Sequence, residues 1–164
     1  MIIGHGDIAS VLPDREDRLY FASGVSNSRE TRKSEYEREK RLLLSQDKYR
    51  HVVYFSSLSV LYTDTLYAQH KLRMEKLVKE NFKHYTIIRI GNIDWGTNPN
   101  TLINYLRAHP EAEIKDVFRY IVDKQEFLYW VGLIPSWPCE MNVPGRRLKV
   151  WEIVDEYIKP LRAS

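Results

Sequence analysis

The chain has 164 residues, 43% of them hydrophobic, a mean hydropathy of −0.46 and a formal net charge of +3. These values are typical of one compact, soluble globular domain with a core of ordinary size. No apolar run approaches the roughly 20 residues of a membrane-spanning helix and no signal peptide opens the chain, so we expect a cytoplasmic protein without a membrane partner.

Apolar strands and helices are predicted to alternate along the chain. Five strands are expected, at 1–3, 18–22, 51–56, 86–90 and 127–131. Six helices are expected, at 6–12, 28–45, 67–82, 101–108, 114–122 and 149–161. Alternation of this kind predicts a parallel sheet with helices on both faces, and therefore an α/β fold.

The helix expected at 28–45 carries the densest group of basic residues, SRETRKSEYEREKR over 28–41. Acidic residues are interleaved with the basic ones. This pattern is typical of a solvated helix with ion pairs between residues four apart, and not of a basic stripe for a nucleic acid. We therefore expect no nucleic-acid partner.

Three prolines and a glycine lie in the tract 135–145, which we expect to be a loop that forms a lid or a contact surface. The tract contains Cys139, the only cysteine, which excludes an internal disulfide framework and a cysteine metal cluster. The five histidines have no ligand spacing, so we expect no metal site.

The stretch 54–71, YFSSLSVLYTDTLYAQHK, combines a strand-like run, paired serines and a Tyr-x-x-x-Lys pair. On a helix, Tyr67 and Lys71 lie one turn apart on the same face. An ammonium beside a phenol favours the phenolate, so we expect Lys71 to lower the Tyr67 pKa from about 10 towards neutrality. Such a phenol exchanges a proton with a substrate oxygen, which the Ser57 hydroxyl steadies. The alternative is a chance spacing on an amphipathic helix.

This order of motifs resembles the extended short-chain dehydrogenase/reductase family, which includes nucleotide-sugar epimerases, dehydratases and reductases. Its motif is a strand ending in S-S-x-x-V, followed by Y-x-x-x-K; here Ser57 lies three residues before Val60. The resemblance implies that Ser57, Tyr67 and Lys71 are catalytic. It also implies that Lys71 binds the nicotinamide ribose of NAD or NADP. The linker from Ser57 to Tyr67 is shorter than the family's.

Further segments extend the resemblance over nearly the whole chain. The opening MIIGHGDIAS is similar to the family's first strand and glycine-rich turn, which implies that Gly4, Gly6 and Ala9 bind the cofactor's pyrophosphate. RLYFASGVSN is similar to the family's fourth strand, which implies cofactor contacts for Ala22 and Ser23.

The substrate side is represented by three more segments. TIIRIGN places Asn92 on a family position that touches the substrate, and FRYIVD places Arg119 on the arginine that grips a nucleotide diphosphate. The alternative for Arg119 is a surface salt bridge. NVPGRRLKVWEIVDEYIKPL resembles the family's last strand and closing helix. The resemblance implies a nucleotide-sugar ligand and a homodimer through the helices at 28–45 and 67–82.

The chain departs from the family near its start. Only residues 11–17 separate the first glycine-rich segment from the counterpart of the fourth strand, so the second and third strands and the acid that holds the adenosine ribose are missing. We expect a truncated Rossmann-like domain over 1–164, in which 97–164 form a reduced substrate side. The connection from the first strand to the counterpart of the fourth strand then has three options. Its helix lies on the opposite face of the sheet from the usual one, the connection is left-handed, or the first strand is displaced.

Three functional hypotheses remain. The first is an NAD(P)-dependent oxidoreductase or epimerase that acts on a nucleotide-sugar through Ser57, Tyr67 and Lys71. The second is a non-catalytic relative without the cofactor, serving as a binding, regulatory or dimeric scaffold protein. The third is a mononucleotide or phosphate site at Gly4 and Gly6. The intact Ser-Tyr-Lys set favours the first hypothesis, and the missing ribose acid favours the second.

Overall fold

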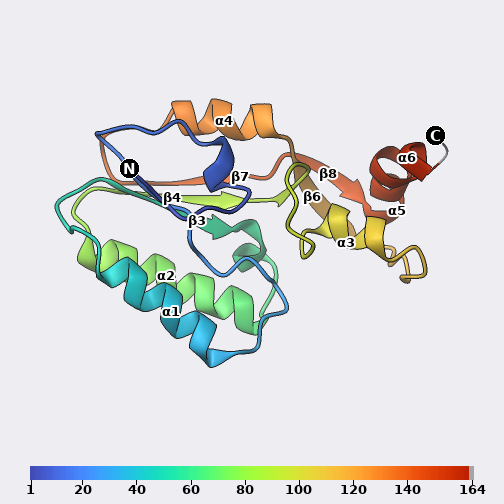
Figure 1. The fold of residues 1–164 in the computed structure, drawn as a ribbon, viewed down its shortest axis with the longest axis horizontal. Helices are drawn as coiled ribbons and strands as arrows, with labels where there is room; N and C mark the ends of the chain where they lie inside the picture. Colours follow the sequence, from blue (N-terminus) through green and yellow to red (C-terminus); the bar gives the residue numbers. More distant parts are fainter. Residues whose placement is uncertain (163–164) are drawn as a thin grey trace.

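The computed structural model describes residues 1–162, and its main element is a parallel five-stranded sheet (Figure 1). The strands lie in the order β1-β2-β3-β4-β7. Their bounds are β1 (Ile2–Ile3), β2 (Leu19–Phe21), β3 (Val52–Ser57), β4 (Tyr85–Ile90) and β7 (Cys139–Val143). All neighbours in the sheet run parallel, so the carboxyl ends of the strands lie at one edge. The predicted parallel α/β sheet is confirmed.

Helices cover both faces of this sheet. Helices α1 (Lys33–Leu44) and α2 (Leu66–Asn81) lie on one face, and α4 (Lys124–Gly132) lies on the other (Figure 1). The strands alternate accordingly: Leu19 and Phe21 pack with the α1–α2 core, whereas Tyr20 packs with the α4 core.

A smaller three-stranded sheet follows the carboxyl end of β4. It has the order β5-β6-β8, with β5 (Asn92–Ile93), β6 (Phe118–Val122) and β8 (Arg146–Lys149). Helix α3 (Leu102–Ala108) and the closing helix pack on it through Ile103, Ile121 and Ile153. The closing helix consists of α5 (Val150–Ile153), a π-helical segment (Val154–Ile158) and α6 (Lys159–Arg162). No helix within 1–162 is both long and apolar enough to cross a membrane.

The connection from β1 to β2 crosses the sheet on the same face as α4 (Figure 1). Its Leu12 belongs to the apolar cluster that contains Phe127 and Val131 of α4, whereas Leu43 of α1 belongs to the opposite cluster. The steps from β1 to β2 and from β2 to β3 move in the same direction, so the two connections have opposite hands. The two consecutive crossovers through α1 and α2 share one hand, and such crossovers are almost always right-handed, so we assign the left hand to the short first connection. The return from β4 to β7 over α4 lies on the same face as the first connection and shares its hand.

Two predicted elements have the wrong type. The segment 127–131 is helical within α4 and not a strand, because Asp123 caps the helix by accepting from Glu126 N at 2.7 Å. Phe127 and Val131 are then one turn apart and both reach the core. The segment predicted as a helix at 114–122 instead contains strand β6, which pairs with β5 and β8.

Two other predictions fail in extent. The helix predicted at 6–12 is only a 3₁₀ turn at Ala9–Val11, because Leu12 and Pro13 lead the chain away towards β2. The tract 135–145, predicted to be a loop, contains β7, which adds a strand beside β4.

Strand β3 begins after His51, a buried histidine in a polar setting. Arg18 donates to its Nδ1 at 3.1 Å, and its Nε2 lies 2.8 Å from Thr86 Oγ1. Burial, together with the Arg18 guanidinium, lowers the His51 pKa from 6.5 to about 4. Between about pH 4 and pH 6.5, therefore, His51 is protonated in the unfolded chain and neutral in the folded chain. The stability that neutral His51 contributes is present above about pH 6.5 and is lost as the pH falls towards about 4.

We expect His51→Gln to remove about 2 kcal/mol of the stability difference between pH 7 and pH 4.5. Urea unfolding followed by circular dichroism at both pH values measures that difference. His5→Gln is the matched control, because His5 is exposed and is not among the groups that shift the His51 pKa. An unchanged pH dependence in His51→Gln would contradict the assignment.

Candidate functional site

The carboxyl end of β3 and the first turn of α2 meet at the candidate site. Ser57 ends β3, and its Oγ accepts from Ser59 N at 3.2 Å, which turns the chain into a 3₁₀ segment. Helix α2 begins at Leu66 because Thr65 Oγ1 accepts from Ala68 N at 3.1 Å. This places Tyr67 in the first helical turn, where its phenol is near enough to the Ser57 hydroxyl for the serine to act on the Tyr67 pKa. The short linker thus still brings the serine and the tyrosine together.

Lys71 lies one helical turn after Tyr67 and is buried, with 2% of its surface exposed. Its Nζ is 5.5 Å from the centroid of the Tyr67 ring. The same Nζ donates to Glu39 Oε1 at 3.2 Å and to the Tyr54 hydroxyl at 3.4 Å. The ammonium therefore points into a buried polar network and is not open to solvent.

Glu39 of α1 is the centre of that network and is completely buried. Its carboxylate accepts from Val25 N at 2.7 Å and from the Tyr54 hydroxyl, and it lies 3.2 Å from His70 Nε2. Burial alone would raise its pKa, but the Lys71 ammonium and these hydrogen bonds lower it to about 2. Burial likewise works against the charge on Lys71, yet the Glu39 carboxylate raises the Lys71 pKa above its ordinary value. The two groups form a buried ion pair at neutral pH.

Glu39 was not identified from the sequence, although a signal for it exists. It lies in a charged run, but it is four residues before Leu43, and both are fully buried. A carboxylate on the buried stripe of a helix must find a partner there. Only the fold shows that the partner is Lys71, because the two residues are 32 positions apart.

The prediction that Lys71 lowers the Tyr67 pKa towards neutrality is wrong. Burial raises the pKa of Tyr67 above its ordinary value, and neither the nearby Lys71 charge nor the Ser57 hydroxyl overcomes it. The Glu39 carboxylate adds to the rise. Tyr67 is therefore a protonated phenol at neutral pH, and it serves as a hydrogen-bond donor more readily than as a base.

The glycine-rich turn lies at the end of β1, beside the end of β2. Gly4 has a φ of +117°, and a Cβ there would lie 2.4 Å from the Ala22 carbonyl oxygen, so only glycine fits. Ala9 is buried within the 3₁₀ turn, and the Ser23 carbonyl accepts from Arg38 at 3.0 Å. No α-helix starts at Gly6, so the turn lacks the helix N-terminus that usually faces a pyrophosphate.

Asp7 ties this turn to the loop that follows β5. Its carboxylate accepts from Thr97 N at 3.0 Å and from Asn98 N at 2.8 Å. Its carbonyl oxygen accepts from the Trp95 indole at 3.1 Å, and Gly96 approaches with a φ of +96°. The position next to the predicted pyrophosphate site thus carries a negative charge, which disfavours a phosphate there.

We expect Asp7→Ala to free the loop at 96–98 and to cost about 1–3 kcal/mol of stability, since two amides lose a charged acceptor. Hydrogen exchange followed by nuclear magnetic resonance checks this, because exchange at Thr97 and Asn98 should accelerate at least tenfold. Asp64→Ala, at an exposed position before α2, is the control. Unchanged exchange at both amides would contradict the tie.

The two residues predicted for substrate binding lie on the smaller sheet. Asn92 Nδ2 donates to the Tyr120 carbonyl at 3.0 Å, and Arg119 donates to the Phe118 carbonyl at 2.8 Å. Arg119 also lies near Tyr62, where its charge opposes the rise in phenol pKa that burial causes. The Tyr62 and Tyr120 rings are 5.9 Å apart. Two aromatic rings thus lie against each other here, within electrostatic range of the Arg119 guanidinium.

The residues at the strand ends do not fit a resident nicotinamide dinucleotide. Lys71, which would hold the ribose, is paired with Glu39 and packs beneath Gly24, where an added Cβ would lie 2.6 Å from Nζ. Asp7 places a carboxylate beside the pyrophosphate turn. Strand β1 is an edge of the sheet formed by residues 1–162, so no further strand there carries a ribose-binding acid.

Metal-binding side chains are not clustered in the described part of the chain: no three His, Cys, Asp or Glu residues are placed to hold an ion.

Comparisons with known proteins identify the fold. No protein-family model and no curated protein matches the chain. The enzyme WbmG of Bordetella bronchiseptica, in complex with NAD and UDP, matches with a TM-score of 0.64 and 15% identity, over 90% of this chain and 57% of that chain. The dTDP-4-dehydrorhamnose reductase of Bacillus anthracis, in complex with NADP, matches with a TM-score of 0.63 and 13% identity, over 89% and 62% of the two chains. A UDP-galactose 4-epimerase matches with a TM-score of 0.59 and 14% identity, over 85% and 60%.

These likenesses show that the chain has the Rossmann-like α/β fold of nicotinamide-dependent epimerases and reductases. At identities of 13 to 15%, they establish the fold and not the activity. The chain spans only 57 to 62% of the length of these three solved structures.

Proposed function

We propose that this chain is a nucleotide-sugar-binding relative of the NAD(P)-dependent sugar-nucleotide enzymes that holds no resident dinucleotide and acts as a binding or regulatory protein. The observation that carries the proposal is the buried ion pair between Lys71 and Glu39. It occupies the ammonium that a nicotinamide ribose would need, and burial, with the Glu39 carboxylate, raises the pKa of Tyr67. One of the structures with this fold, WbmG, is described in complex with UDP as well as NAD.

The polar groups near the site suit a sugar joined to a nucleoside diphosphate. Ser57 and Tyr67 offer two hydroxyls at the end of β3, which can hydrogen-bond sugar hydroxyls. Arg119 offers a forked cation for phosphate oxygens within electrostatic range of Tyr62, and the paired rings of Tyr62 and Tyr120 offer apolar surface to a base.

Calorimetric titration with UDP and with UDP-glucose tests this proposal. We expect Arg119→Gln to weaken binding of both ligands by about 10-fold or more, the usual effect of losing a charged hydrogen bond. Tyr67→Phe should weaken UDP-glucose by about 5-fold and leave UDP unchanged, because the phenol contacts only the sugar. Arg73→Gln, at an exposed position on α2, is the control. Absence of saturable binding of either ligand at millimolar concentration would overturn the proposal.

The second candidate is the NAD(P)-dependent enzyme, which is favoured by the proximity of Tyr67 to both Ser57 and Lys71. It requires either a change in nicotinamide absorbance or conversion of the nucleotide-sugar to another product when cofactor and nucleotide-sugar are supplied together. Both should be lost in Tyr67→Phe. Binding of UDP-glucose with neither a change in nicotinamide absorbance nor a new product favours the first proposal.

A further inference from the structure

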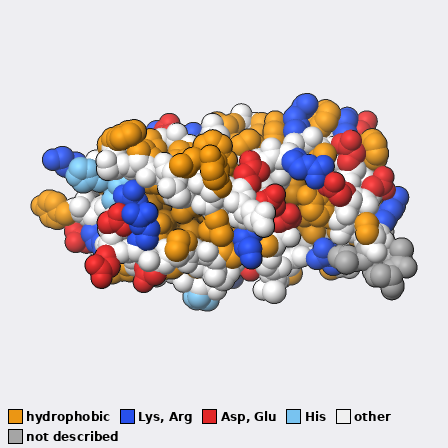
Figure 2. All heavy atoms as spheres, turned by 90° about the horizontal axis from the view of Figure 1, so that it is seen from above, with side chains coloured by type: hydrophobic (Ala, Val, Ile, Leu, Met, Phe, Trp, Pro, Cys, Tyr) orange, Lys and Arg blue, Asp and Glu red, His pale blue; other side chains and the backbone are white. Residues whose placement is uncertain are grey.

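The outer side of α4 and the turn after it expose four large apolar side chains. Tyr129 is 63% exposed, Trp130 36%, Leu133 51% and Trp137 66%. Figure 2 looks onto this face of the molecule and shows hydrophobic side chains gathered over α4. Monomeric proteins rarely leave such a patch in water. We call these four residues the α4 ridge.

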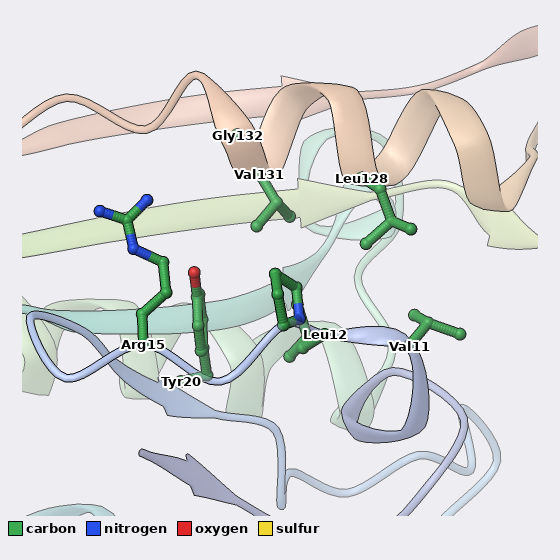
Figure 3. Close-up of a pocket in the computed structure, with 8 residues that line it drawn as sticks. Val11, Leu12, Arg15, Tyr20, Leu128, Val131 and Gly132 are labelled. Carbon is green, nitrogen blue, oxygen red and sulfur yellow. The ribbon is translucent and has the colours of Figure 1, made fainter.

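An apolar groove runs beside the ridge, between α4 and the segment that connects β1 to β2 (Figure 3). Its lining consists of Val11, Leu12, Pro13, Arg15, Tyr20, Leu128, Val131 and Gly132. Leu128 and Val131 point from α4 towards Leu12 (Figure 3). Nothing lies within 4 Å of a Cβ placed on Gly132, so this end of the groove is open.

Ridge and groove are adjacent on the same helix. Tyr129 and Leu133 follow the groove residues Leu128 and Gly132 by one position each, which is about 100° around a helix. Each molecule therefore presents the apolar α4 ridge next to the apolar groove. Two copies related by a twofold axis can each place the α4 ridge in the groove of the other copy, as an isologous contact requires.

Charge also favours a second copy as the occupant. The α4 ridge contains no charged side chain, and the one charge in the groove, Arg15, is paired with Asp17 at 2.7 Å. The face can thus meet itself without like charges in contact. The exposed positions of α1 and α2, where the family resemblance predicts the dimer, are mostly charged: Lys33, Glu37, Lys40, Arg41, Arg73, Lys76, Lys79 and Glu80. That surface would require many charges to be desolvated.

We propose that this chain forms a homodimer through the α4 face, with the α4 ridge of each copy seated in the groove of the other. The exposed parts of the four ridge side chains supply roughly 400 Å² per copy. The groove that receives the partner's ridge is small and adds roughly 100 Å² per copy, so the dimer buries roughly 1,000 Å² in all, the lower limit of a specific interface. Two tryptophans and a tyrosine supply the residue types that dominate binding energy in such contacts.

Sedimentation equilibrium over a series from about 1 to 100 μM tests this interface, a range that covers ordinary dimer affinities. The wild-type chain should be dimeric. Tyr129→Lys on the ridge and Gly132→Glu in the groove should each weaken the dimer by at least about 30-fold. Leu72→Glu, on the exposed side of α2, should leave the dimer intact. Circular dichroism verifies that each variant is folded.

Mixing the two weakened variants separates an interface from a general effect on solubility. In the mixed dimer the new lysine faces the new glutamate, and the other contact is native, so the pair should re-form a dimer. A wild-type chain that stays monomeric throughout the series would overturn the proposal. So would a dimer that dissociates in Leu72→Glu but persists in Tyr129→Lys, because that result places the contact on α2.

Discussion

Replacing Glu39 by glutamine is expected to destabilise the fold by about 3–5 kcal/mol, the usual cost of leaving one member of a buried ion pair without its partner. Lys71 would keep its charge in a site with 2% exposure and lose the carboxylate 3.2 Å away. Urea unfolding at pH 7, followed by circular dichroism, measures the loss.

Two further variants show whether the ion pair is the cause. Glu37→Gln, exposed on the same helix, should change stability by less than about 0.5 kcal/mol. The double variant Glu39→Gln with Lys71→Met should recover most of the loss, because it removes both charges together. A loss below about 1 kcal/mol in Glu39→Gln would contradict the buried pair.

The same pair predicts a pH dependence with a definite sign. The Glu39 pKa is about 2 in the fold, against an ordinary glutamate value of 4.5, so the folded state binds fewer protons between these values. Its stabilising effect is therefore present above about pH 4.5 and is lost as the pH falls towards about 2. The acid-induced loss of stability should be smaller in Glu39→Gln than in the wild-type chain.

Replacing Phe127 by alanine is expected to cost about 3–5 kcal/mol, because it opens a cavity in the core beneath α4. Phe127 is fully buried, and its ring centroid lies 5.8 Å from that of Phe55 and 5.4 Å from that of Trp95. The same urea experiment measures the effect. Gln125→Ala, exposed on the same helix, should be near neutral. A comparable loss in both variants would mean that α4 itself, and not the core contact, is affected.

Four of the five strands of the main sheet could be predicted from the sequence because they have apolar runs. Strand β7 could not, because it lies in a tract rich in proline and gains its partner, β4, only in the folded chain. The run VVYFSS became β3 and the run YTIIRI became β4, both within one or two residues of the prediction. The run FLYWV over 127–131 was ambiguous, since every position is apolar and neither period stands out. The N-cap at Asp123 stabilises the helical alternative. Strand β6 could not be recognised because FRYIV gains its partners, β5 and β8, only in the folded chain.

The candidate site was only partly predictable for the same reason. The approach of Ser57 and Tyr67 follows from a strand end and a helix start, which are local features. Burial of Tyr67 raises its pKa, and Glu39, which pairs with Lys71 from another helix, adds to the rise. Both effects depend on tertiary packing, so spacing within one helix predicted the wrong direction for the Tyr67 pKa. The function of Asp7 likewise depends on a loop about 90 residues away along the chain.

The most direct test of the proposed function is a titration of the purified chain with NADH and with NADPH, followed by nicotinamide fluorescence. Lys71 is held by Glu39, and Asp7 lies beside the glycine turn. We therefore predict no saturable binding of either dinucleotide up to about 1 mM, which corresponds to a binding free energy weaker than about −4 kcal/mol. Saturable binding in the micromolar range that weakens in Lys71→Met would contradict this account. It would show that Lys71 leaves Glu39 to hold a ribose, and that the chain is a cofactor-binding oxidoreductase.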